Sequence, residues 1–168
     1  LEQARAGIAA QGVDLLLGEA VFASPHEVRV NGEMLRSARF VIATGTTALI
    51  PDIEGLAETG YITNVEAVAL PELPKRLVVI GAGPIGLEFA QMFSRFGAKV
   101  VVLDHGPHPL PREDSALALA LCAQLAAEGI RIELGAEMRC GEAGARGKRI
   151  HIRSRDGREE DLVADQLL

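Results

Sequence analysis

The residues best suited to chemistry in this sequence are three glycines and an aspartate, spaced as a phosphate-linked nucleotide would need them. Gly81, Gly83 and Gly86 follow the pattern G-x-G-x-x-G, and Asp104 ends an apolar run further along the chain. The first glycine permits a tight turn, the second lets backbone approach a pyrophosphate, and the third lets a helix pack closely. A carboxylate at Asp104 can accept both hydroxyls of an adenosine ribose. The predicted dinucleotide site comprises Gly81, Ala82, Gly83, Pro84, Ile85, Gly86 and Asp104.

The segments around this turn are those that such a site requires. A β-branched run at 77–80 precedes it, and another at 99–103 leads to the acid. Between them the sequence predicts a helix that ends at Gly97, and whose N-terminal N–H groups and dipole favour phosphate. Pro84 suits the first helical position, where an N–H would lack a partner in any case. An ordinary glycine turn in an unrelated unit is the alternative, and the flanking elements disfavour it. The expected apolar face of the helix is Ile85, Phe89, Met92, Phe93 and Phe96.

Composition excludes several classes of function. The chain has 168 residues, of which 48% are hydrophobic and 24% charged, a normal globular balance. A net charge of −6 and only 4% aromatic residues give no reason to expect a nucleic acid or an anionic membrane as partner. No apolar run is long enough to cross a bilayer, so a cytoplasmic protein is expected. The spacing of Cys122 and Cys140 favours two structural cysteines, although a disulfide between them stays open.

Residues 1–70 predict short strands joined by turns. Residues 1–11 are typical of a helix end, and Asn31-Gly32 between two alternating runs is the strongest short signal of a hairpin. The expected strands are 13–17, 19–23, 27–30, 34–36 and a buried one at 39–44 that runs into Gly45.

The stretch that follows reads as a connection between domains. Residues 48–55 are extended and contain proline, and Thr63 with Glu66 predicts a capped short helix. Pro71 and Pro74 place a domain boundary near residue 70.

Beyond Asp104 the pattern alternates once more and then becomes antiparallel. A proline-rich loop at 105–111 leads to a helix at 115–128, whose apolar stripe is expected to be Leu117, Leu121 and Leu125. The remaining expected strands are 130–134, then 136–140, 148–153 and 158–163 as an antiparallel meander, and 165–168 back in the parallel sheet. The fold class is therefore α/β, a parallel sheet of the βαβαβ kind with an antiparallel meander.

Taken together, these segments resemble the pyridine nucleotide-disulfide oxidoreductases, the flavoprotein disulfide reductases that include dihydrolipoamide dehydrogenase and mercuric reductase. They occur in the family's order and cover most of the chain. The segments are FVIATGTTALIPDIEGL, LPKRLVVIGAGPIGLEFAQMFSRFGAKVVVLD, LPRED, LAAEGIRIELGAEM and ADQLL.

The resemblance implies a Rossmann-like FAD/NAD(P)-binding fold and assigns roles to its parts. Residues 1–70 would be the C-terminal part of an FAD-binding domain, and 71–168 an NAD(P)-binding domain truncated in its last strand. Glu88 matches a family glutamate near the nicotinamide and the flavin ring, and Met138 matches a position whose backbone lies near the adenosine. The residues expected near the flavin are Ala43, Thr44 and Gly45.

The choice between NADH and NADPH depends on the end of the second strand. Asp104 there accepts ribose hydroxyls and repels a 2′-phosphate, whereas NADPH enzymes usually place an arginine in this loop. His105 and His108 follow, with no arginine before Arg112, which reads as a surface residue. Glycine rather than alanine at Gly86 favours the same choice. The sequence predicts NADH, with His105 at the cofactor and a phosphate contact open to a protonated histidine.

Several parts of the family pattern have no counterpart in these residues. The FAD glycine motif, the CxxxxC redox pair and the C-terminal interface domain, through which a homodimer would form, are not matched. The chain is therefore expected to be an inactive nucleotide-binding fragment of an enzyme that passes hydride from NADH to FAD, and electrons on to a disulfide or metal ion. The alternatives are a stand-alone NAD(P)-binding module, and an FAD-dependent NADH reductase without a redox disulfide.

Overall fold

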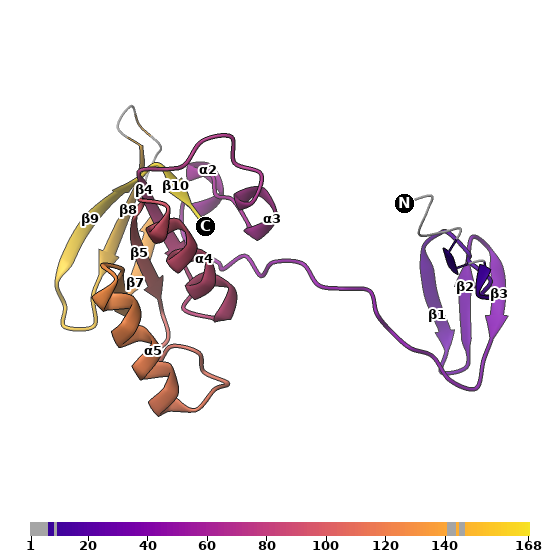
Figure 1. The fold of residues 1–168 in the computed structure, drawn as a ribbon. Coiled ribbons are helices and arrows are strands. Elements are labelled where there is room, and N and C mark those ends of the chain that lie inside the picture. Colours follow the sequence, from indigo (N-terminus) through magenta and orange to yellow (C-terminus); the bar gives the residue numbers. More distant parts are fainter. Residues whose placement is uncertain (1–6, 9, 141–143, 145–146) are drawn as a thin grey trace. The chain divides into compact units, whose positions relative to one another are not determined.

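The computed structural model describes residues 7, 8, 10–140, 144 and 147–168 (Figure 1). The chain divides into two compact units, Leu1–Thr47 and Ala48–Leu168. Residues 7, 8 and 10 are helical, and the rest of the helix expected at 1–11 lies largely outside the described residues. In the described part of the chain, no helix has the length and apolar character needed to span a bilayer.

The first unit contains a three-stranded antiparallel sheet in the order β1-β2-β3. The strands are β1 (Ala20–Ser24), β2 (Glu27–Val30) and β3 (Glu33–Arg36). Asn31 and Gly32 connect β2 to β3 with φ of 50° and 88°. Positive φ at both central positions belongs to the tight turn that matches strand twist, so the hairpin prediction is confirmed.

Two strands expected in this unit are wrong. Residues 13–17 and 39–44 have no regular secondary structure. The segment 39–44 was expected to be buried, yet Val41 is 93% exposed. Apolar β-branched residues favour a strand only where a neighbouring strand pairs with them. Phe40 packs its ring against Phe22 of β1, with the ring centroids 5.1 Å apart, but neither segment pairs with a described strand.

The second unit is built on a four-stranded parallel sheet in the order β10-β4-β5-β6. Two helices connect its strands, so the predicted βαβαβ order and the α/β class are confirmed. The strands are β4 (Arg76–Ile80), β5 (Lys99–Asp104), β6 (Arg131–Leu134) and β10 (Gln166–Leu167), and the helices are α4 (Pro84–Arg95) and α5 (Ser115–Ala127).

The parallel sheet is covered on both faces, as the continuous apolar run of its central strand requires. Leu77 and Val79 of β4 pack in one buried cluster with α4 and α5, whereas Val78 packs in a second cluster with the antiparallel meander. The meander consists of β7 (Glu137–Cys140), β8 (Lys148–Arg153) and β9 (Glu159–Ala164) in the order β7-β8-β9.

The apolar stripes expected for the two long helices are partly wrong. Leu117 of α5 is 72% exposed, and the buried residues of this helix are Ala118 and Leu125. Because α5 carries leucine or alanine on every side, its composition does not select a face. In α4, Ile85 and Phe96 are exposed, and the face against the sheet is Leu87, Ala90 and Phe93.

Two short helices, α2 (Leu56–Thr59) and α3 (Asn64–Ala67), also belong to the second unit. The predicted capping box is confirmed: Thr63 accepts a hydrogen bond from Val65 N, and Glu66 accepts one from Thr63 N at 2.7 Å. Leu56 is buried in the cluster beneath the meander. The compact unit thus starts at Ala48, and the functional boundary predicted near residue 70 stays a prediction.

The last strand is fastened to β4 by an ion pair. The Asp165 carboxylate accepts hydrogen bonds from Arg76 N at 2.9 Å and Arg76 Nε at 3.2 Å. The side-chain hydrogen bond from Arg76 lowers the pKa of Asp165 below its ordinary value. Asp165 N also donates to Arg76 O at 2.9 Å, so the pair lies where β10 enters the sheet.

We expect Asp165→Asn to lower the free energy of unfolding by about 0.5–1 kcal/mol at pH 7, because the pair is partly exposed and screened by water. A lowered folded-state pKa stabilises above the unfolded pKa, and this stabilisation disappears as pH falls below about 4. Urea denaturation at pH 7 and pH 3 measures both effects. Asp52→Asn, at an exposed carboxylate, is the control. A difference between Asp165→Asn and wild type that is as large at pH 3 as at pH 7 would contradict this assignment.

Candidate functional site

The glycine turn joins β4 to α4 at the carboxyl edge of the parallel sheet. Gly81 has φ of 115°, which a side chain rarely tolerates, and its N–H donates to Leu103 O at 2.8 Å. Gly86 lies against this turn: a methyl group there would overlap the Gly81 carbonyl oxygen and lie 3.3 Å from Cγ1 of Val79. Close packing of helix on strand is therefore possible only because residue 86 has no side chain.

The start of α4 is open to an anion. Gly83 is the N-cap residue, makes no side-chain cap, and has nothing within 4 Å of the position of a Cβ. Pro84 occupies the first turn, where its missing N–H loses no helical hydrogen bond. The remaining N–H groups of the first turn and the helix dipole provide a site for a phosphate. A pyrophosphate thus fits the residues present at Gly81–Gly86.

Asp104 braces the turn from the end of β5. Its carboxylate accepts hydrogen bonds from Ala82 N at 2.6 Å and Gly106 N at 2.7 Å, and its side chain is 18% exposed. Each carboxylate oxygen retains a lone pair for a further donor, such as a ribose hydroxyl. His105 is almost fully exposed, with Nδ1 3.6 Å from the Asp104 carboxylate.

The loop after Asp104 folds back over the turn and contacts the next strand. Leu110 N donates to Ala82 O at 3.0 Å, and Gly135 N donates to Gly106 O at 2.8 Å. Ala136 N donates to Asp104 O at 2.9 Å. The residues on either side of Asp104 are therefore held in place by backbone hydrogen bonds from two directions.

Glu88 lies on the exposed side of α4, one turn after its start. It borders a hollow of about 260 Å³ between α4 and α5, with Leu87, Leu110 and Leu121 among the lining residues. Among the described residues its carboxylate has no hydrogen bond or ion pair. The Glu88 carboxylate is thus free to contact a ligand, and its predicted place near the nicotinamide stays a prediction.

The other predicted residues lie apart from the turn. Met138 of β7 is half-buried, its side chain packs against the cluster beneath the meander, and it lies opposite Ile152 of β8. Ala43, Thr44 and Gly45 belong to the first unit, where they are exposed and have no regular structure. The structure brings together Gly81–Gly86, Asp104 and His105, while the three residues expected near a flavin belong to the other unit of the chain.

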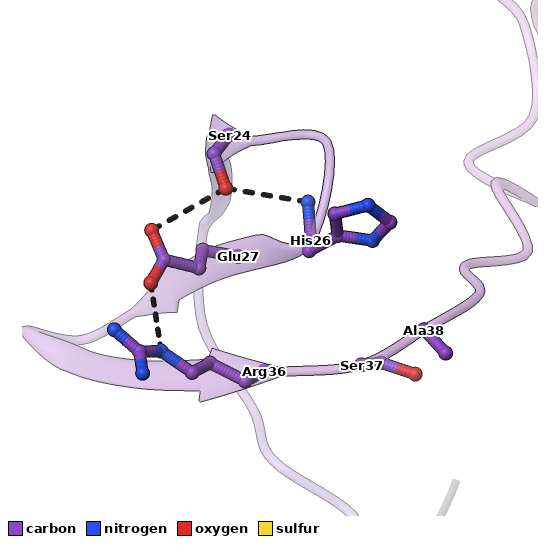
Figure 2. Close-up of a pocket in the computed structure, with 6 residues that line it drawn as sticks. All are labelled: Ser24, His26, Glu27, Arg36, Ser37 and Ala38. Atoms are coloured by element: carbon purple, nitrogen blue, oxygen red, sulfur yellow. Dashed lines mark hydrogen bonds and ion pairs between the residues drawn. The ribbon is translucent and has the colours of Figure 1, made fainter.

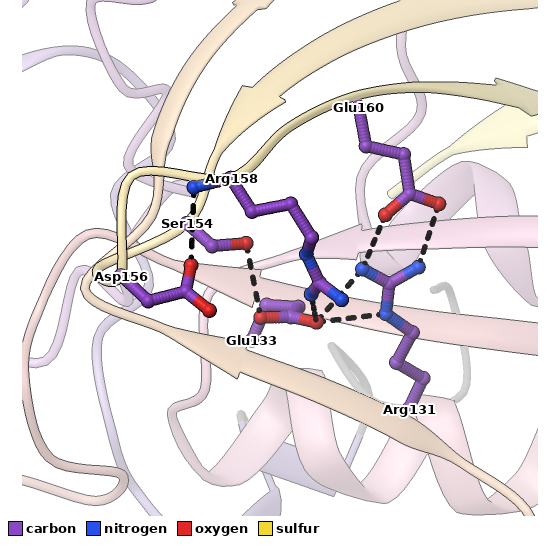
Figure 3. Close-up of polar contacts among 6 residues, drawn as sticks. All are labelled: Arg131, Glu133, Ser154, Asp156, Arg158 and Glu160. Atoms are coloured by element: carbon purple, nitrogen blue, oxygen red, sulfur yellow. Dashed lines mark hydrogen bonds and ion pairs between the residues drawn. The ribbon is translucent and has the colours of Figure 1, made fainter.

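The sequence patterns did not predict two groups of interacting residues. One is the network in which Arg131 of β6 holds Glu160 of β9 through two hydrogen bonds, at 2.9 and 2.7 Å, and also bonds to Glu133 (Figure 3). The hydrogen bond from Arg131 lowers the pKa of Glu160. The other is the contact of Asp104 with Ala82. The Arg131–Glu160 and Ala82–Asp104 contacts join residues 29 and 22 positions apart, so neither contact leaves a local pattern in the sequence.

A second hollow, of about 550 Å³, lies in the first unit (Figure 2). Glu27 on its wall accepts hydrogen bonds from Arg36 Nε at 2.7 Å and Ser24 Oγ at 3.3 Å. The charges of Glu27 and Arg36 in this hollow thus pair with each other. The His26 ring points away from this carboxylate in Figure 2. These contacts fix the β1–β2 turn against β3, and we assign them a structural role.

Both cysteines are at least partly buried. Cys122 and Cys140 are both free, and burial raises the pKa of each thiol. A raised thiol pKa lowers the thiolate fraction, which is the reactive form. The prediction of two structural cysteines agrees with this environment.

Fold and site together define a Rossmann-type nucleotide-binding unit with an antiparallel meander on one face of its sheet. A family model described as pyridine nucleotide-disulphide oxidoreductase matches residues 2–168. The chain belongs to this family of oxidoreductases.

Named relatives agree with that assignment. The chain is 34% identical over 157 residues to a mercuric reductase of Bacillus cereus, covering 94% of this chain and 25% of the relative. It is 36% identical over 132 residues to a dihydrolipoyl dehydrogenase of Acholeplasma laidlawii, covering 76% of this chain and 39% of the relative. The structure of the HOCl-induced flavoprotein disulfide reductase RclA from Escherichia coli aligns with a TM-score of 0.76 at 31% identity, covering 99% of this chain and 38% of that one. The chain thus spans well under half the length of these relatives.

Proposed function

We propose that the unit Ala48–Leu168 binds NADH, as the nicotinamide-nucleotide-binding part of an FAD-dependent oxidoreductase. The observation that carries this proposal is the glycine turn at the carboxyl edge of β4, with the unblocked start of α4 behind Gly83. A ligand with a pyrophosphate and a ribose diol uses both this turn and the nearby Asp104.

Each residue near the turn has a separate task in this proposal. The N–H groups at the start of α4 hold the pyrophosphate, and Asp104 accepts the hydroxyls of the adenosine ribose while it keeps Ala82 in place. The backbone of Met138 borders the adenosine, and Glu88 orients the nicotinamide end. When bound there, NADH would be the hydride donor to the flavin of the parent enzyme.

The parent activity rests on the relatives rather than on residues of this chain. Mercuric reductases and dihydrolipoyl dehydrogenases occur among them, so we infer that the parent passes electrons from FAD to a disulfide or a metal ion. The role of Ala43, Thr44 and Gly45 near the flavin stays a prediction. Dimer formation through a further domain stays a prediction.

The chain is expected to bind NADH about tenfold more tightly than NADPH, because the Asp104 carboxylate accepts ribose hydroxyls and repels a 2′-phosphate. Isothermal titration of the 168-residue chain with each nucleotide measures the two dissociation constants. Equal or tighter binding of NADPH would refute the preference, and failure to bind either nucleotide would refute the function itself.

A stand-alone sensing module would bind NADH equally well, so NADH binding alone does not distinguish it from a part of an FAD-dependent oxidoreductase. We expect no oxidation of NADH by the chain with artificial electron acceptors, with or without added FAD. A full parent sequence that carries a CxxxxC pair would support a disulfide reductase, and one without it would support the related NADH reductases.

A further inference from the structure

A hollow of about 310 Å³ lies beside the proposed nucleotide site and has no role in the binding described so far. It lies between the start of β7 and the hairpin that connects β8 to β9. Its lining residues are Gly135, Glu137, Arg153, Ser154, Arg155 and Gly157.

Gly135, which lines this hollow, and its neighbour Ala136 are hydrogen-bonded to the backbone around Asp104. Gly135 N donates to Gly106 O at 2.8 Å, and the neighbouring Ala136 N donates to Asp104 O at 2.9 Å. Gly106 N in turn donates to the Asp104 carboxylate at 2.7 Å. The hollow therefore borders the end of β5, where the adenosine ribose of the proposed ligand would lie.

One cation in this hollow, the exposed Arg155, has no anionic partner in the part of the chain that the structure describes. Arg153 forms an ion pair with Glu137 at 3.6 Å, and Arg158 forms one with Glu133 at 3.1 Å. Arg155, by contrast, makes no hydrogen bond or ion pair with any residue that the structure describes. Its side chain lies along Gly135, where a methyl group would be 3.5 Å from Arg155 Cδ. The five N–H donors of the Arg155 guanidinium thus have no acceptor among the described residues, while the aliphatic part of the side chain lies beside Gly135.

The hairpin that carries Arg155 is held in place by the network of Figure 3. Ser154 Oγ donates to Glu133 at 3.4 Å, and Arg158 Nη2 donates to the same carboxylate at 3.1 Å. Across the turn, Ser154 N donates to Arg158 O at 2.8 Å. Both neighbours of the turn are therefore fixed on β6, and the backbone of Arg155 has a defined position relative to Gly135.

We propose that Arg155 is a specificity-determining residue that donates hydrogen bonds to a phosphate on the adenosine ribose, with the hollow beside Gly135 as the phosphate subsite. This inference rests on the proposed function, because it needs the adenosine at the end of β5. Asp104 disfavours a 2′-phosphate and Arg155 offsets part of that repulsion. The two residues together set how strongly the chain prefers NADH to NADPH.

The competing explanation is that Arg155 only covers Gly135 with the aliphatic part of its side chain. The two explanations differ in what they predict for ligands. A covering role changes the affinity for all adenosine nucleotides alike, or changes only stability. A phosphate-binding role changes the affinity for ligands with a 2′-phosphate and leaves the others unchanged.

The test is titration of wild type, Arg155→Gln and Arg155→Lys with NADH, NADPH, 5′-AMP and adenosine 2′,5′-bisphosphate. For Arg155→Gln we expect NADPH and the bisphosphate to bind about tenfold more weakly, while NADH and 5′-AMP stay within about twofold. Arg155→Lys keeps the charge and should lose less. The difference between wild type and Arg155→Gln should also shrink as salt is raised from 0.05 to about 0.5 M.

Arg149→Gln is the control, since it removes the same charge near the start of β8, from a residue that does not line the hollow, and should leave all four affinities unchanged. Arg112→Gln tests whether the arginine at the end of the loop that follows Asp104 contacts the 2′-phosphate instead. Selective loss of NADPH affinity in Arg112→Gln but not in Arg155→Gln would overturn the proposal, as would an equal loss for all four ligands in Arg155→Gln. If wild type binds neither NADH nor 5′-AMP, the proposed function fails. If Arg155→Gln binds NADH and keeps the NADPH affinity of wild type, the proposed function stands and the phosphate subsite at Arg155 is refuted.

Discussion

Replacing Gly86 with alanine is expected to lower the free energy of unfolding of the second unit by about 2–3 kcal/mol and to weaken NADH binding more than tenfold. A methyl group at this position overlaps the Gly81 carbonyl oxygen, which is backbone and cannot rotate away. Either α4 moves off the sheet or the turn changes shape. Urea denaturation and NADH titration measure the two effects on one preparation.

Gly83→Ala is the matched control, because it adds the same methyl group in the same turn. Gly83 has an ordinary φ of −80° and nothing within 4 Å of the added atom. We therefore expect unfolding to change by less than about 1 kcal/mol, while NADH binds about tenfold more weakly because the methyl group stands where the pyrophosphate approaches. If Gly83→Ala bound NADH as wild type does, the pyrophosphate would have to lie elsewhere. If Gly86→Ala were as stable as wild type, the packing described for the turn would be wrong.

Asp104→Asn is expected to destabilise the second unit by about 2 kcal/mol. The carboxylate accepts hydrogen bonds from two backbone donors, Ala82 N and Gly106 N, and an amide offers only one acceptor atom. One of these N–H groups would then face an NH₂ group in a site that is 18% exposed, and an unpaired donor there carries most of its desolvation penalty. Thermal and urea denaturation at pH 7 measure the loss.

The same variant separates the two tasks assigned to Asp104. If the residue both braces the turn and accepts the ribose diol, NADH affinity should fall by about tenfold, and NADPH affinity should fall less, because a repulsive charge is also removed. Asp114→Asn is a suitable control, since Asp114 caps α5 through Ala116 N and Leu117 N rather than the turn. Equal losses for NADH and NADPH in Asp104→Asn would restrict Asp104 to a structural role.

The order of elements in the second unit could be predicted from the sequence because each signal is local. The β-branched runs around residues 77–80 and 99–103, the glycine turn and the stop at Gly97 depend on backbone preferences within a few residues. The capping box at Thr63 and the hairpin at Asn31-Gly32 belong to the same class. These parts of the fold agree with the structure to within a residue or two.

The wrong predictions concern which residues of an apolar segment are buried against neighbouring elements. Leu117 looked like a core residue because leucine recurs along α5, yet Ala118 and Leu125 are the buried residues. The strand expected at 39–44 had the right composition, yet the segment pairs with no strand that the structure describes. Burial depends on what packs against a segment, which periodicity alone cannot determine when every side of a helix is apolar.

By itself, the sequence determined the α/β class, the dinucleotide motif at Gly81–Gly86 and the acid at Asp104, because these follow from backbone geometry within one short stretch. Only the tertiary structure showed that Asp104 holds Ala82 in place, that Glu133 fixes the β8–β9 hairpin, and that Arg155 lies against Gly135. Such contacts join residues 20 or more positions apart, and their formation depends on how strands and hairpins pack rather than on any local preference.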